Sequence, residues 1–145
     1  MFSVILAAVD GSIRSRRVLD TALELADRFD ARVHLFQAVA IPQAFPAAAR
    51  MPVDDLPELL EKEARRALAE LAAGHGRVRI EAPDVTTPQP WRAIIAAARN
   101  VGADLIVIGS HGFSGWDRVV GTNASKVADH ADRSVLVVHE REKKK

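Results

Sequence analysis

A glycine-bearing segment from Gly109 to Asn123 holds the residues best suited to chemistry in this sequence. Gly109 and Gly112 have no side chain, so the backbone there could come close to a bulky anion. Gly121, Thr122 and Asn123 open a predicted helix, whose first amides lack intrahelical partners and lie at the positive end of the helix dipole. Together these features predict a phosphate cradle. A flexible loop ending in an ordinary cap at Thr122 or Asn123 would contain the same residue types, so both interpretations stay open at this point.

A second polar segment, Asp10-Gly11-Ser12, directly follows the first apolar run of the chain. Asp10 is a candidate for contacting a ligand, because it stands where a strand is expected to end. The alternative is a structural role, in which its carboxylate caps the next helix or closes an Asx turn.

Catalytic and metal-binding arrangements are weakly indicated. His111 lies in the glycine-bearing segment, but no serine or carboxylate stands at a spacing that would make it a general base. None of the five histidines forms a metal-ligand pair in the sequence. The segment from Gly109 to Thr122 contains no lysine and lacks the Walker-A spacing. We therefore expect a binding protein rather than an enzyme, with weak hydrolysis of a bound phosphate compound at most.

The elements that would position these residues follow from the apolar pattern of the chain. Short β-type runs alternate with longer stretches of helical period, which predicts five strands and four helices. The predicted strands cover residues 2–9, 33–39, 77–82, 105–108 and 135–138, and the helical stripes cover 18–29, 56–71, 91–98 and 124–131. Residues 41–52 contain three prolines and no regular period, which predicts a surface loop.

Strict alternation of strands and helices is typical of an α/β protein with an open, doubly wound parallel sheet. The run at 105–108 is apolar on both faces and is expected in the middle of the sheet, whereas 77–82 alternates with period two and is expected at an edge. Right-handed crossovers favour the strand order 3-2-1-4-5. In such sheets ligands bind where successive connections leave in opposite directions, here between the first and fourth strands. Both polar segments leave from those strands.

Length and composition indicate one domain of ordinary character. We expect a domain over residues 1–140 and a charged, disordered tail at 141–145. No apolar run reaches the roughly 18 to 20 residues of a membrane helix, and no signal peptide is predicted. The chain has no cysteine, which is compatible with a cytoplasmic protein. Its formal net charge of +1 gives no reason to expect nucleic-acid binding.

The motifs at both polar segments resemble those of the universal stress protein family, over essentially the whole domain. The similar stretches are Val9-Asp10-Gly11-Ser12, Asp104-Leu105-Ile106-Val107-Ile108-Gly109-Ser110-His111-Gly112, Gly121-Thr122-Asn123 and Ser134-Val135-Leu136-Val137-Val138. The resemblance implies a flavodoxin-like topology, binding of ATP (or ADP or AMP, with Mg possible beside ATP) and assembly as a dimer.

The resemblance also implies a set of binding residues. Asp10 would lie near the adenine and ribose, and the backbone of Ala38 would meet the adenine edge. The phosphate cradle would comprise the glycines and the helix start described above. The complete expected set is Ala8, Val9, Asp10, Ser12, Ala38, Ile108, Gly109, His111, Gly112, Gly121, Thr122 and Asn123. Eight residues separate Gly112 from Gly121, one fewer than the commonest family pattern, a departure that bears on the place of the terminal phosphate.

The expected function is adenine-nucleotide binding in a stress-response or signalling protein, with occupancy modulating conformation or partner binding. The alternative is a nucleotide-free protein interaction module of the same fold. A phospho-acceptor receiver domain shares the topology but requires an acidic pair at the end of the first strand, an acceptor aspartate after the third strand and a lysine after the fifth. Here the third and fifth strands are followed by Ala82-Pro83-Asp84 and by His139, which disfavours a receiver.

The fifth predicted strand, residues 135–138, would lie at a sheet edge without the charges that usually protect an edge. Pairing with the same strand of a second chain would satisfy its unpaired amides. We therefore expect a homodimer through this strand, in agreement with the dimers that the resemblance implies.

Overall fold

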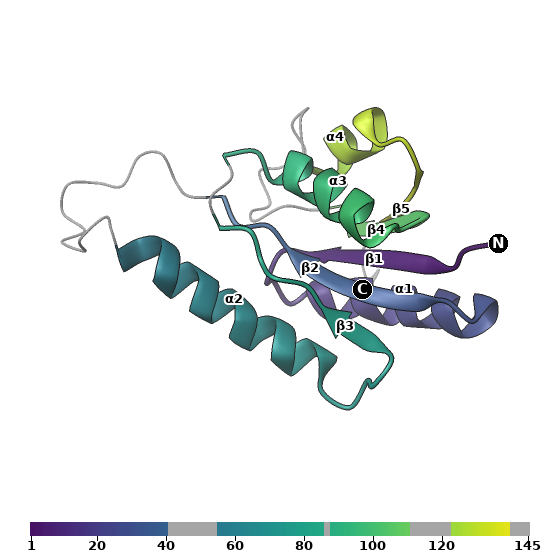
Figure 1. Ribbon diagram of the computed structural model, residues 1–145, viewed down its shortest axis with the longest axis horizontal. Helices are drawn as coiled ribbons and strands as arrows, with labels where there is room; N and C mark the ends of the chain where they lie inside the picture. Colours follow the sequence, from purple (N-terminus) through teal and green to yellow (C-terminus); the bar gives the residue numbers. More distant parts are fainter. Residues whose placement is uncertain (41–54, 86–87, 111–122, 140–145) are drawn as a thin grey trace, which may run out of the picture.

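One sheet of five parallel strands organises the molecule, as the computed structural model shows for residues 1–40, 55–85, 88–110 and 123–139 (Figure 1). The strands are β1 (Val4–Val9), β2 (Arg32–Gln37), β3 (Val78–Ile80), β4 (Leu105–Gly109) and β5 (Ser134–Val138). They lie in the order β3-β2-β1-β4-β5, all pairs parallel. The predicted α/β fold and strand order are confirmed.

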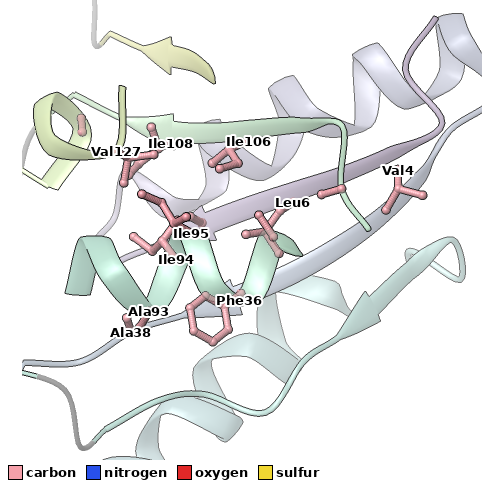
Figure 2. Close-up of a cluster of buried hydrophobic side chains, with 14 residues drawn as sticks. Val4, Leu6, Phe36, Ala38, Ala93, Ile94, Ile95, Ile106, Ile108 and Val127 are labelled. Atoms are coloured by element: carbon pink, nitrogen blue, oxygen red, sulfur yellow. The ribbon is translucent and has the colours of Figure 1, made fainter. Parts of the chain in front are cut away.

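Four helices cover the two faces of this sheet. They are α1 (Ser15–Phe29), α2 (Leu56–Ala72), α3 (Pro90–Val101) and α4 (Asn123–His130). Side chains of α1 and α2 pack in one core cluster and those of α3 and α4 in another. Figure 2 shows the second cluster, in which Leu6, Ile106 and Phe36 of the sheet meet Ile94 and Ile95 of α3.

The two central strands are buried because helices lie against both of their faces. All six residues of β1 are buried, and so are the first four of β4. Alternate β1 residues serve opposite clusters: Leu6 belongs to the cluster of α3, and Ile5 and Ala7 to that of α1. This explains why the sequence of these strands is continuously apolar instead of alternating.

Several predicted boundaries are wrong by one to three residues. β1 begins at Val4, not at residue 2, and β2 ends at Gln37, not at residue 39, with Ala38 forming only an isolated bridge to Asp84. Helix α4 ends at His130, one residue before the predicted stripe does. At these ends, apolar residues continue beyond the last residue of the strand or helix. The apolar pattern in the sequence is therefore longer than the regular secondary structure. The predicted loop at 41–52 lies entirely outside the described residues.

Strand β3 is much shorter than its alternating pattern predicted. It spans Val78–Ile80 instead of residues 77–82, and Ile80 is 41% exposed although the pattern placed it on the inner face. β3 pairs only with β2, so its edge position is confirmed. At this edge, Val78 packs against the core cluster that includes α2, whereas Ile80 does not belong to that cluster.

The amino ends of the central strands are tied together by one carboxylate. Asp104, just before β4, accepts hydrogen bonds from the amides of Ser3 (2.8 Å) and Val4 (3.2 Å). Its own amide donates to the carbonyl of Val4 at 2.9 Å. These three bonds set the start of β4 against the start of β1 and leave the opposite end of the strands to the connecting loops.

Strand β5 forms the other edge of the sheet and pairs only with β4 within the chain. Ser134 and Leu136 of this strand are exposed (38% for Leu136), and its three valines are half-buried. Among the described residues, no helix has both the length and the apolar character needed to cross a membrane.

Candidate functional site

A pocket opens at the carboxyl ends of β1 and β4, where α1 leaves toward one face of the sheet and α4 toward the other. Its empty space is about 580 Å³ when the adjoining open solvent is included. Its described lining consists of Ala8, Val9, Asp10, Arg14, Val18, Ala38, Pro90, Ile94, Ile108, Gly109, Ser110, Asn123 and Ala124. The pocket therefore occupies the switch point that the strand order predicted.

Both core clusters contribute to the apolar wall of the pocket. Ala8, Ala38 and Ile94 belong to the cluster beneath α3 and α4, whereas Val9 and Val18 belong to the cluster beneath α1. The hollow thus begins where the two packed layers separate at the end of the sheet. Its apolar wall is made of buried side chains that the fold holds in place.

The β1–α1 turn is built by side chains that bond to its own backbone. The Ser12 amide donates to Oδ1 of Asp10 (2.9 Å), and the Arg14 amide donates to Oγ of Ser12 (3.2 Å). Oγ of Ser15 accepts from the Gly11 amide (3.1 Å) and donates to Asp10 Oδ1 (3.3 Å). Asp10 therefore closes an Asx turn and also lines the pocket, so the two interpretations of this residue are compatible.

Gly11 is required by the shape of this turn. Its φ of +81° lies in the left-handed region, and a Cβ there would come within 2.9 Å of Nε2 of Gln37. Gln37 is itself buried, and its Oε1 has no hydrogen-bond partner among the described residues. A side chain at position 11 would therefore be strained and would press on a confined neighbour.

Gly109 and Ser110 form the pocket wall at the end of β4. A Cβ on Gly109 would lie 3.4 Å from Cγ2 of Val18, so α1 passes close to this glycine. The Ser110 amide continues the ladder by donating to the carbonyl of Val138 (2.9 Å). Its hydroxyl oxygen is buried and has no hydrogen-bond partner among the described residues, although Ser110 lines the pocket. Such a group is a candidate for bonding a ligand.

Ala38 is fixed in the opposite wall by the connection after β3. The Asp84 amide donates to the Gln37 carbonyl (3.1 Å), and the Val39 amide donates to the Asp84 carbonyl (2.7 Å). These bonds make the Ala38–Asp84 bridge and extend β2 just far enough to reach the pocket. Pro90, the first residue of α3, lines the same pocket.

Seven residues of the expected binding set line this pocket. They are Ala8, Val9, Asp10, Ala38, Ile108, Gly109 and Asn123. Ser12 does not line it, and its hydroxyl instead caps the Arg14 amide. His111, Gly112, Gly121 and Thr122 lie outside the described residues. Asn123 is the first residue of α4, as predicted.

Six lining residues were not expected from the sequence: Arg14, Val18, Pro90, Ile94, Ser110 and Ala124. Val18, Ile94 and Ala124 were assigned to the core stripes of their helices, and each lies where its stripe reaches the end of the sheet. Arg14 stands one helical turn before Val18, and that spacing was the signal that could have found it.

The shifted ionisations of the described residues lie away from the pocket. On α2, the pKa of Glu63 is lowered because Arg66 donates a hydrogen bond to its carboxylate. Beyond α4, a hydrogen bond from Arg133 lowers the pKa of Asp132. No group of three or more histidine, aspartate or glutamate side chains gathers among the described residues in a way that could hold a metal ion.

The fold and the pocket together define an open parallel α/β domain with a ligand-type pocket at its topological switch point. The chain belongs to the universal stress protein family, whose model matches residues 1–139. A curated relative, universal stress protein A homolog 1 of Coxiella burnetii, is 33% identical over 136 residues, which cover 92% of this chain and 94% of the relative.

Solved structures of the family have the same fold. A universal stress family protein from Burkholderia pseudomallei superimposes with a TM-score of 0.68 at 30% identity, covering 94% of this chain and 95% of that one. A universal stress protein solved in complex with cAMP has a TM-score of 0.63 at 25% identity, covering 95% of this chain and 97% of that one. Adenine nucleotide is therefore a ligand of at least one structural relative.

Proposed function

We propose that this protein binds an adenine nucleotide, with ATP as the expected ligand, in the pocket at the ends of β1 and β4. The observation that carries the proposal is that seven residues expected at the site from sequence line one pocket. They come from β1, β4 and α4 and from the residues that directly follow β1 and β2, and they are far apart in the chain. The structural relative in complex with cAMP adds support for the ligand class.

The two kinds of wall in the pocket suit an amphipathic ligand. Ala38, Pro90 and Ile94 offer an apolar surface on which a purine base can be buried. Asp10, Ser110 and Asn123 offer polar groups for the ribose and the phosphates. In this proposal Oδ2 of Asp10, the carboxylate oxygen that the turn does not use, accepts hydrogen bonds from the ribose hydroxyls.

Occupancy, rather than turnover, is the proposed mode of action. Phosphoryl transfer requires a metal-holding acid, a phosphate-clamping cation and a positioned base or water. Asp10 is the sole carboxylate in the described lining, and Oδ1 of this group is already engaged by the turn. We propose weak hydrolysis at most, with Mg accompanying bound ATP, and signalling through the conformation or partner surface of the occupied state.

The remaining parts of the proposal concern assembly and location. We propose that two chains pair through β5, because it is an edge strand whose sequence, from Val135 to Val138, has no charge. We place the protein in the cytoplasm, without nucleic-acid or membrane partners, on its lack of cysteine and its formal net charge of +1. Residues 1–140 would form the domain, and 141–145 a charged tail.

Mass spectrometry of nucleotide released from freshly purified protein, followed by titration calorimetry with ATP, tests the binding proposal. Ala38→Leu would fill the apolar half of the pocket and is expected to weaken ATP binding at least tenfold. Ala40→Leu is the matched control, since Ala40 is exposed two residues further along and does not line the pocket. It is expected to leave ATP affinity unchanged.

Two results would contradict the proposal. One is a wild-type protein that carries no adenine nucleotide and does not bind millimolar ATP, which would favour the nucleotide-free interaction module. The other is equal ATP affinity in wild type and a folded Ala38→Leu protein, which would move the binding site elsewhere.

A further inference from the structure

Arg14 is half-buried and is the one cationic side chain in the described lining of the pocket. It directly precedes α1, and its backbone angles (φ −75°, ψ −16°) already have helical values. Its position relative to the next turn of α1 can therefore be inferred from helical spacing.

Helical spacing places Arg14 on the β4 side of the pocket. Val18 lies four residues later on the same face of α1, and its Cγ2 is the nearest atom to a Cβ built on Gly109, at 3.4 Å. Arg14 thus lies one helical turn before the residue of α1 that contacts Gly109. Ser110 is the next residue of the chain after Gly109. Ala38 and Pro90 belong to the opposite, apolar half.

Four backbone amides at this turn are already engaged within the chain. The amides of Gly11, Ser12 and Arg14 already donate to Ser15, Asp10 and Ser12. The Ser15 amide donates to the Ser12 carbonyl at 3.0 Å. An anion near the start of α1 therefore cannot be held by these amides in the way that a phosphate is held by a P-loop.

We infer that Arg14 binds the phosphate portion of the nucleotide and makes the pocket select phosphorylated adenosine over adenosine itself. The inference rests on the proposed nucleotide binding and assigns a residue that the sequence motifs do not include. A guanidinium can donate two parallel hydrogen bonds to phosphate oxygens. The Ser110 hydroxyl, which is buried and has no hydrogen-bond partner in the described part of the chain, also lines the pocket and supplies a further donor.

The test compares binding of adenosine, AMP, ADP and ATP by titration calorimetry in wild type, Arg14→Gln and Arg17→Gln. Arg17 is an exposed arginine of α1 that does not line the pocket, so its variant removes the same charge as a matched control. Arg14→Gln is expected to weaken ATP binding about 10- to 100-fold, the range for charged hydrogen bonds, and adenosine binding less than about twofold. Arg17→Gln should leave all four affinities within about twofold.

Three outcomes would overturn the inference. Equal losses for adenosine and ATP in Arg14→Gln would mean that Arg14 packs against the nucleoside or supports the fold. Unchanged affinities for every ligand would mean that it does not contact the nucleotide. A wild-type protein that binds none of the four ligands would overturn the proposed function and this inference together, which separates that failure from the first two. Thermal unfolding without ligand checks that the variants remain folded.

Discussion

Asp10 has one observed role, in the β1–α1 turn, and one proposed role, in ligand binding. Oδ1 accepts hydrogen bonds from the Ser12 amide and the Ser15 hydroxyl, and so holds the β1–α1 turn closed. The same side chain lines the pocket, and in the proposed function its other oxygen accepts from the ribose hydroxyls. A turn built in this way keeps the binding group in one orientation before any ligand arrives, which lowers the entropy cost of binding.

The two tasks of Asp10 can be separated with two substitutions. Asp10→Asn keeps an acceptor for the turn, so it should change the free energy of unfolding by less than about 0.5 kcal/mol, whereas Asp10→Ala should cost about 1 kcal/mol. Both should weaken ATP binding about tenfold, because a charged acceptor for ribose is lost. Urea unfolding and titration calorimetry measure the two effects. Wild-type ATP affinity in Asp10→Asn would restrict Asp10 to the turn.

The predicted site residues that could be located are those whose role depends on strand ends. Asp10 and Gly109 follow apolar runs, so the pattern alone places them at one edge of a parallel sheet, whereas Ala38 was implied by the family resemblance. Arg14 and Ser110 escaped prediction for a different reason. An arginine before a helix and a serine after a glycine are common, and only the packing of α1 against β4 brings them to the same pocket.

At the scale of elements, the central strands were easier to predict than the edges. β1 and β4 are covered on both faces, so every residue contributes to a continuous apolar signal. β3 has cover only near Val78, and its alternating pattern overstated its length and the burial of Ile80. The end of an edge strand depends on the strand it pairs with and on the helices packed against it. The sequence of the strand itself does not contain this information.

The proposed β5 pairing can be tested with one exposed leucine. Leu136→Lys places a charge on the edge strand and should convert a dimer to a monomer, as measured by sedimentation velocity at micromolar concentration. Leu59→Lys on α2 is the control, because Leu59 is similarly exposed (44%, against 38% for Leu136) but far from this edge in the sheet order. It should leave the association state unchanged. A wild-type protein that is monomeric at these concentrations would contradict the pairing.

At the scale of the whole molecule, the two ends of the sheet are held in different ways. At the amino end, Asp104 ties β1 to β4 through the amides of Ser3 and Val4. At the carboxyl end, the same strands are followed by the turn of Asp10 and by Ser110, which line the pocket. Stability and binding are therefore expected to respond to different substitutions.

Asp104→Ala should show this separation. Loss of two hydrogen bonds to a charged acceptor is expected to lower the free energy of unfolding by about 2–3 kcal/mol, measured by urea unfolding. Affinity for ATP should stay within about twofold of wild type in calorimetry below the unfolding transition. A large loss of affinity in the folded variant would show instead that strain at the amino end reaches the pocket.

The bond between Asp104 and the first strand has a consequence for how such a protein can change over time. A scaffold pinned at one end tolerates altered side chains at the other, because a new residue at the pocket does not have to preserve the pairing of β1 with β4. Ligand preference can then drift by single substitutions, at positions such as Arg14, while the fold persists. Divergent proteins that share this sheet could in this way change ligand specificity while every intermediate sequence still folds.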